Sequence, residues 1–158
     1  MRFSKRLQVT CMLVQLFSMS NMMTSAHGEQ SAHRTGMNEI KATIASIKTS
    51  GSTRQRTDFA WHLSVLIRKE DPANIDVDTI DEITGLLRDR DDSVRYWAAA
   101  SLGYLGQHAE RAIPALRTAL LESACLPGTK TSASGIIIAL RKIGIEPEVT
   151  SCQNPSAK

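Results

Sequence analysis

Aromatic residues are scarce in this chain, and strand-like patterning is absent. Its 158 residues include only three Phe, two Trp and two Tyr, and apolar β-branched residues nowhere alternate with polar ones. Strands favour β-branched and aromatic side chains, so the composition favours helices. The core is therefore expected to be aliphatic, built from Leu, Ile and Ala.

Signatures of catalysis and of metal binding are also missing. The sequence contains no phosphate-binding glycine loop, nucleophile elbow or dinucleotide fingerprint. The histidines (His27, His33, His62 and His108) show no helical zinc spacing. His27 would chelate copper only as a new N-terminus, and no second ligand is evident. We therefore predict a non-catalytic protein without a cofactor or a metal site.

The first 26 residues have the features of an export signal. A basic start precedes the apolar stretch from Leu7 to Phe17, and a cleavage site of small residues follows, ending at Ala26. Polar residues interrupt the run, which disfavours a membrane anchor of about 20 apolar residues. An uncleaved anchor and a lipoprotein at Cys11 are the alternatives. We predict cleavage near Ala26, a periplasmic or secreted protein, and no stable membrane insertion of the mature chain.

Removal of residues 1–26 changes the charge balance. The whole chain has 19 Lys and Arg against 16 Asp and Glu, and three basic residues fall in residues 1–26, which leaves 16 against 16. A neutral mature chain argues against a nucleic-acid partner. Residues 70–92 are nevertheless acidic, with two basic residues against nine acidic ones. Helix caps and solvated turns explain such a run, and an acidic docking stripe is the alternative.

Helical periodicity covers most of the chain. Residues 27–36 lack it, and we expect a flexible leader there. The periodicity begins at Met37, is interrupted at residues 49–53, and ends before Asp71-Pro72 because the residue before proline avoids helical geometry. The apolar positions expected on one face are Met37, Ile40, Ile44, Ile47, Phe59, Leu63, Leu66 and Ile67.

Two further pairs of helices follow. One pair begins near Asp78, turns at residues 88–92 and stops at Gly106. The last pair ends with a helix over residues 132–143, closed by Gly144. The core positions expected in these pairs are Ile80, Ile83, Leu86, Leu87, Val94, Ala98, Ser101, Leu102, Leu105, Ile113, Leu116, Leu120 and Leu121.

The helix pairs repeat one another. Superposing Gly106 on Gly144, a shift of 38 residues (144 minus 106), matches Leu102 with Leu140. For the first pair, a looser shift of 35 residues (94 minus 59) places Phe59 on Val94. Such spacing predicts a helical solenoid of about three units, since no unit can bury its apolar face alone.

The segment DDSVRYWAAASLGYLG, residues 91–106, combines an Asp-rich turn, Val-Arg, an alanine stripe and Leu-Gly-x-Leu-Gly. It resembles the second helix of a HEAT-like repeat of the PBS-lyase type, strongly over residues 78–121 and weakly over the rest of 37–144. The resemblance implies an all-α, right-handed solenoid that presents a binding surface. It also implies a polar ladder between repeats, here from Asp91 or Asp92 and Arg95. Some relatives act on bilin chromophores, whereas others only bind proteins.

The few aromatic residues cluster on one helix. Tyr96, Ala100 and Tyr104 share the face opposite the apolar stripe, and second helices of such solenoids line the concave side. The 35-residue shift places Trp61 beside Tyr96. We therefore predict a partner-binding surface of large aromatics with one orienting cation, comprising Trp61, Tyr96, Trp97, Tyr104 and Arg95. The alternative is that Trp97 fills space between repeats while the tyrosines cover surface.

Two cysteines, Cys125 and Cys152, remain after export. An even pair in an exported chain predicts a disulfide. It would hold the tail as a cap over the last helix, whose residues 136–138 are apolar on more than one side. The alternative is that this apolar end is a dimer face, so we expect a monomer or a weak homodimer.

The sequence thus predicts an export signal (1–26), a leader (27–36), a HEAT-like repeat domain (37–150) and a tail (151–158). We expect an exported interaction module that binds another protein through its concave aromatic face. The alternative is a lyase-related accessory factor that holds a small hydrophobic ligand or a chromophore in the groove. A third reading is a structural subunit that assembles through residues 136–138.

Overall fold

A computed structural model describes residues 34–123 and 132–147. Within these ranges all regular structure is helical, and the described residues from Met37 onward belong to one compact unit. A helix over residues 34–49 comes first. The α-helices that follow are α2 (Thr53–Lys69), α3 (Val77–Gly85), α4 (Asp92–Leu105), α5 (Ile113–Ser123) and α6 (Ser132–Ile143). Short 3-10 helices connect them: η1 (Pro72–Asn74), η2 (Leu86–Arg88) and η3 (Gly106–Ala112).

Side-chain caps explain where several helices begin. The side chains of Ser52, Asp76 and Asp91 accept hydrogen bonds from backbone N–H groups in the first turns of α2, α3 and α4. Gly144 ends α6 with a φ of 102°, in the left-handed region that favours glycine. There the N–H of Ile145 donates to the carbonyl of Leu140 at 2.9 Å, which completes a Schellman motif.

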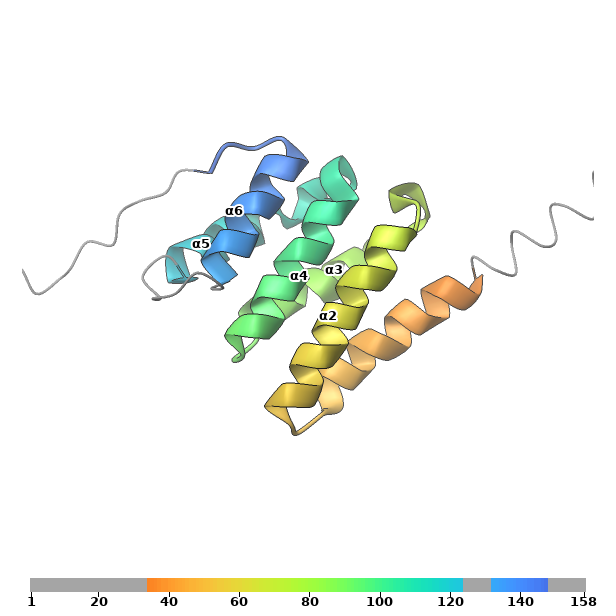
Figure 1. The fold of residues 1–158 in the computed structure, drawn as a ribbon. Helices are drawn as coiled ribbons and strands as arrows, with labels where there is room; N and C mark the ends of the chain where they lie inside the picture. The colour runs from red at the N-terminus through yellow and green to blue at the C-terminus, as the bar shows by residue number, and fades with distance from the viewer. Residues whose placement is uncertain (1–33, 124–131, 148–158) are drawn as a thin grey trace, which may run out of the picture. The chain divides into compact units, whose positions relative to one another are not determined.

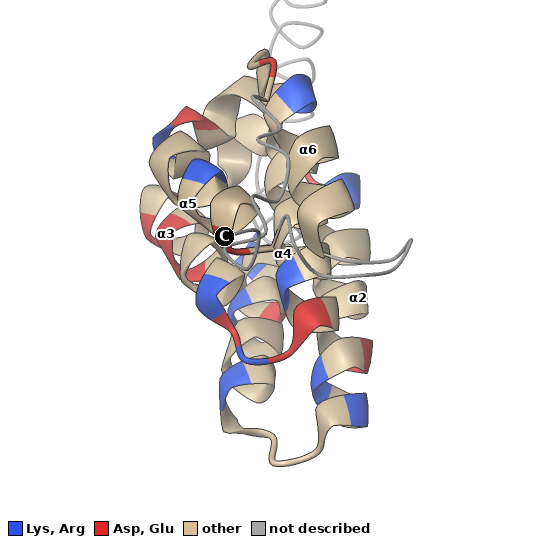
Figure 2. Ribbon diagram, turned by 90° about the vertical axis from the view of Figure 1, so that its left-hand side faces the viewer, with Lys and Arg blue, Asp and Glu red and all other residues tan. Residues whose placement is uncertain are grey.

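The helices form two layers (Figure 1). The second-helix layer contains α2, α4 and α6, and α4 packs against both of the others. The first-helix layer contains the helix over residues 34–49, α3 with η2, and α5. In the view of Figure 2, α3 and α5 lie on one side and α2, α4 and α6 on the other. Pairs of helices stacked in two layers confirm the predicted all-α solenoid.

The core is aliphatic, as predicted, and its burial pattern defines the repeat. A shift of 38 residues carries the buried stripe of α4 onto buried residues of α6, and carries the buried residues of α2 onto those of α4. The predicted shift of 35 for the first pair is wrong, because it places buried Ala60 on partly exposed Arg95. The aligned sets are Arg56, Ala60, Leu63, Ser64 and Ile67; Val94, Ala98, Ser101, Leu102 and Leu105; and Ser132, Ile136, Ala139, Leu140 and Ile143.

Two smaller expectations also need correction. Residues 34–36 are helical rather than part of a flexible leader, because a helix anchored by Ile40 and Ile44 propagates outward at little cost. Leu121, expected in the core, is 63% exposed. It follows Leu120 directly, and the offset of about 100° between neighbouring residues on a helix turns Leu121 away from the buried face of α5.

Candidate interaction groove between α4 and α6

The outer face of α4 carries both tyrosines. The buried face of α4 includes Val94, Ala98 and Leu102. On the opposite face of the same helix, Tyr96 and Tyr104 remain partly exposed. The helical period that buries the apolar stripe therefore also presents the tyrosines. Both tyrosines therefore lie on the helix face opposite the apolar stripe, where the sequence places them.

Small residues let α6 approach that face closely. A methyl group on Gly135 would lie 2.9 Å from Cδ2 of Tyr96, and one on Gly103 would lie 3.1 Å from Cα of Ala139. Between the helices is a hollow of about 140 Å³. We call it the α4–α6 groove. Its lining comprises Tyr96, Trp97, Ala100, Gly103, Tyr104, Gly135, Ile138, Ala139 and Lys142.

The aromatic rings of the groove have defined neighbours. Tyr96 and Trp97 meet edge to face, with ring centroids 4.9 Å apart and planes at 86°. Trp97 and Tyr104 are both partly buried and pack against the core as well as lining the groove. Two cations lie close to the Tyr104 ring: Nζ of Lys142 is 4.4 Å from its centroid, and Cζ of Arg68 is 5.9 Å away.

Trp61 is separate from this cluster. The 38-residue shift aligns it with Ala99 rather than with Tyr96 (61 plus 38), and it does not line the groove. Within residues 34–123 and 132–147, Tyr96 and Trp97 are the only two aromatic rings that contact each other. Trp61 is 52% exposed on α2. The four aromatics predicted as one floor therefore form a cluster of three and a separate residue.

Arg95 belongs to the polar ladder that joins successive repeats. Its Nη2 donates to Asp92 at 2.6 Å, and its Nη1 donates to the carbonyl of Asp89 at 2.8 Å. Asp92 also accepts from the backbone N–H and the hydroxyl of Ser132, the first residue of α6. Arg95 and Asp92 thus form the ladder that the resemblance implied, while Asp91 caps α4. With its guanidinium engaged internally, Arg95 is a poor orienting contact for a partner.

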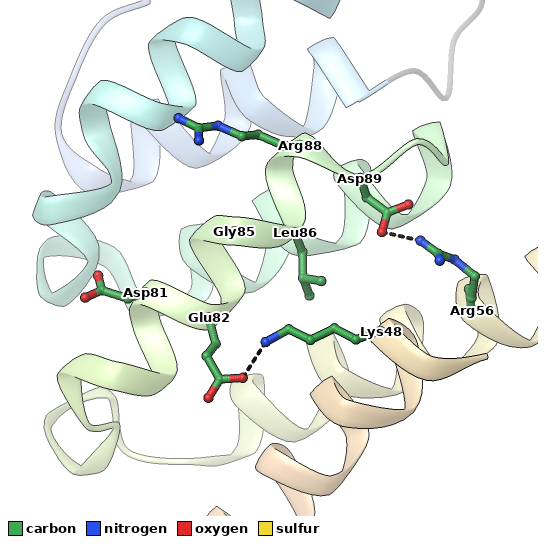
Figure 3. Close-up of a pocket in the computed structure, with 8 residues that line it drawn as sticks. All are labelled: Lys48, Arg56, Asp81, Glu82, Gly85, Leu86, Arg88 and Asp89. Carbon is green, nitrogen blue, oxygen red and sulfur yellow. Dashed lines mark hydrogen bonds and ion pairs between the residues drawn. The ribbon is translucent and has the colours of Figure 1, made fainter. Parts of the chain in front are cut away.

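A second hollow lies in the first-helix layer and contains about 570 Å³ (Figure 3). Its charged side chains are mostly paired. Lys48 contacts Glu82 at 2.7 Å, and Arg56 forms an ion pair with Asp89 that is buried on both sides. Asp81, also on the lining, pairs with Arg111. Because these charges compensate one another, the hollow offers no concentrated charge to a ligand.

The acidic residues between positions 70 and 92 have structural partners. Seven of the nine cap a helix or pair with a cation, and Figure 2 shows acidic residues on and near α3. Because these acidic side chains cap helices or pair with cations of the same chain, they are better explained as caps and turns than as an acidic docking stripe. The seven are Asp71, Asp76, Asp81, Glu82, Asp89, Asp91 and Asp92.

Among the described residues, no group of three or more His, Cys, Asp and Glu is placed to hold a metal ion. None of the described helices is both long and apolar enough to cross a membrane. Cys125, Cys152, the export signal and the leader residues before 34 lie outside the described residues. Their predicted roles remain predictions.

A family model supports the resemblance. The model for the PBS lyase HEAT-like repeat matches residues 94–122, which cover most of α4, all of η3 and nearly all of α5. Comparison with curated proteins found no match, and neither did comparison with solved structures. Together with the two layers and the 38-residue register, the match supports a HEAT-like repeat fold for this chain.

Proposed function

We propose that this protein is a non-catalytic interaction module that binds another protein through the α4–α6 groove. The observation that carries the proposal is the concentration of Tyr96, Trp97 and Tyr104 around one partly open hollow. Rigid aromatics with polar tips are the side chains that anchor protein interfaces. Ile138, 49% exposed at the same hollow, adds apolar surface for a partner to cover.

The size of the groove favours a protein over a chromophore. Sites for small molecules and cofactors enclose on the order of 300–1,000 Å³, whereas this hollow has about 140 Å³. A hollow of this size accommodates one side chain of a partner and lies below the usual range for cofactor sites. The lyase-related alternative is therefore the weaker one.

Partner capture from a native extract tests the proposal. The full chain and its Tyr104→Ala variant are immobilised at equal density, and the retained proteins are compared. Loss of an interface anchor costs about 2 kcal/mol or more, so we expect at least a roughly tenfold loss of a discrete partner. Circular dichroism must show equal helicity for the two proteins.

Leu121→Ala is the matched control. Leu121 is 63% exposed on α5, in the other layer, so its truncation removes apolar surface away from the groove. We expect this variant to retain the partner at the wild-type level. If Tyr104→Ala retains it equally well, the groove is not the binding site.

We also propose that the protein is exported with cleavage near Ala26, and that Cys125 and Cys152 form a disulfide. The bridge needs a long reach, because α6 has 12 residues and spans about 18 Å. Cys125 follows the end of α5, which meets the start of α6 at the Ser123–Ser132 hydrogen bond, whereas Cys152 follows the end of α6. N-terminal sequencing and thiol counting of the native protein test both proposals, and two free thiols would reject the bridge.

A further inference from the structure

Ion pairs neutralise several basic residues of the first-helix layer, whereas the two basic residues beside the groove have no acidic partner among the described residues. Lys41, Lys48 and Arg111 each pair with a carboxylate of the same chain. Arg68 and Lys142 form no ion pair with any described residue. Both lie in the last turns of their helices, α2 and α6. The helix dipole accounts for cations at these ends, but it leaves their charge available to a partner.

Tyr104 holds these two cations at the edge of the groove. Lys142 and Arg68 approach the same ring from neighbouring helices, with Nζ of Lys142 at 4.4 Å and Cζ of Arg68 at 5.9 Å from its centroid. Lys142 also lines the hollow itself. The groove therefore combines an apolar hollow with two cations whose place is set by one aromatic ring.

We propose that the groove binds an acidic segment of a partner protein, and that this segment carries one apolar anchor residue. This proposal rests on the proposed function. The anchor enters the hollow of about 140 Å³ beside Gly103 and Gly135. A cavity of about 150 Å³ holds a benzene molecule, so one Leu or Phe side chain fills this space. Carboxylates next to the anchor pair with Lys142 and Arg68.

Charge complementarity is what selects an acidic partner. Placing two cations opposite a basic segment would cost binding energy through like-charge repulsion, whereas an acidic segment neutralises them and associates faster. Nucleic acid is a poorer match, because residues 27–158 carry as many acidic as basic side chains, 16 of each. Because the cations flank a hollow for one side chain, the groove would select a partner segment by its apolar anchor residue as well as by its charge.

Selection of peptides from a displayed random library tests the proposal. The full chain is the bait, and the affinity of selected peptides is then measured by fluorescence anisotropy. We expect a consensus of Asp or Glu beside Leu, Ile, Met or Phe. In the Arg68→Glu/Lys142→Glu variant we expect affinity to fall by about tenfold or more, because two attractions become repulsions. Raising the salt concentration should weaken the wild-type complex as well.

The matched control reverses two cations elsewhere. Arg88 and Arg117 are exposed and lie on η2 and α5, so Arg88→Glu/Arg117→Glu changes the net charge by the same amount. We expect this control to bind the selected peptides within about twofold of wild type, since surface charges far from an interface are screened by salt.

Three results would overturn the acidic partner. One is a consensus without acidic residues, and another is unchanged affinity in Arg68→Glu/Lys142→Glu. The third is cation-dependent binding of phosphatidylglycerol vesicles with no selected peptide, which would make the ligand a membrane surface. If peptides without acidic residues still depend on Tyr104, the groove remains a protein-binding site and only the partner's chemistry is rejected. Partner capture with Tyr104→Ala decides that broader question separately.

Discussion

Arg56 and Arg95 are each the fourth residue of their helices, α2 and α4, and both contact the turn that begins at Asp89. Arg56 pairs with the Asp89 carboxylate, whereas Arg95 donates to the Asp89 carbonyl. One turn thereby ties two repeats together. Single side chains at the helix starts set the spacing of the second-helix layer, and the groove depends on that spacing.

Loss of Arg56 should be costly. The side chains of Arg56 and Asp89 are only 9% and 11% exposed, so Arg56→Ala leaves a carboxylate buried without its partner. We expect the free energy of unfolding to fall by about 3 kcal/mol. Lys48→Ala removes an ion pair whose members are 48% and 43% exposed, and should cost less than about 1 kcal/mol. Urea denaturation of both variants checks this, and equal losses would refute the role given to the buried pair.

Asp76 makes stability depend on pH in the acid range. Hydrogen bonds from Lys41 and Thr79 lower the pKa of this carboxyl to about 2. Because its folded pKa lies below the unfolded value of about 4, its stabilisation is present above pH 4 and is lost as the pH falls toward 2. The side chain is 43% exposed, so solvent screening limits the effect to roughly 1 kcal/mol.

Comparison with Asp76→Asn isolates that contribution. Asparagine keeps the ability to cap α3 but carries no charge. We expect wild type to be more stable at pH 5, and the difference in unfolding free energy to shrink between about pH 4 and pH 2. A difference that stays constant over this range would show that the ion pair with Lys41 contributes nothing.

At the scale of elements, two glycines in helices should respond oppositely to alanine. Gly85 ends α3 with ordinary helical angles (φ −59°, ψ −32°) and nothing within 4 Å of an added methyl group. Gly85→Ala should therefore stabilise the protein by about 0.5–1 kcal/mol. On Gly135 the methyl group would lie 3.1 Å from the carbonyl oxygen of Tyr96, and backbone must move. Gly135→Ala should destabilise it by about 1–3 kcal/mol.

Thermal unfolding followed by circular dichroism measures both changes. The signs matter more than the sizes, because opposite signs separate helix propensity from packing between α4 and α6. If Gly135→Ala also raised the melting temperature, the close approach of α6 to Tyr96 would be incorrect, and with it the shape of the groove.

Helix positions were predictable from local signals, whereas the site was only partly so. Gly106, Gly144 and Pro72 mark ends or breaks at the expected places, and α6 has the predicted bounds. Gly135 inside an apolar helix was an available sign of close packing, and it was missed. The cations at Tyr104 had no such signal, because Arg68 and Lys142 lie far from it in sequence and meet it only through packing of α2, α4 and α6.

The error over Trp61 has a similar origin. The first repeat lacks the Leu-Gly-x-Leu-Gly signature, so its alignment depended on a few apolar positions. Burial of Arg56 and Ser64, two polar residues on the inner face of α2, fixes the 38-residue shift. An alignment of apolar residues alone does not use these positions.

At the scale of the whole molecule, the aromatic residues of the described ranges all lie in the second-helix layer. In the first-helix layer, ion pairs link the helix over residues 34–49 to α3, and α3 to η3. In the second-helix layer, the groove combines three aromatics with cations that have no acidic partner among the described residues. A scaffold that gathers aromatic residues and two unpaired cations at one groove is suited to binding on that side.

Site-specific photo-cross-linking in the native cell tests that claim most directly. A benzophenone side chain is placed at Ile138 in the groove or at Leu121 on α5, two residues that are 49% and 63% exposed. We predict one discrete protein adduct from position 138, lost when Tyr104→Ala is added, and none from position 121. An adduct from position 121 alone, or equal adducts from both, would contradict an interaction module built on the α4–α6 groove.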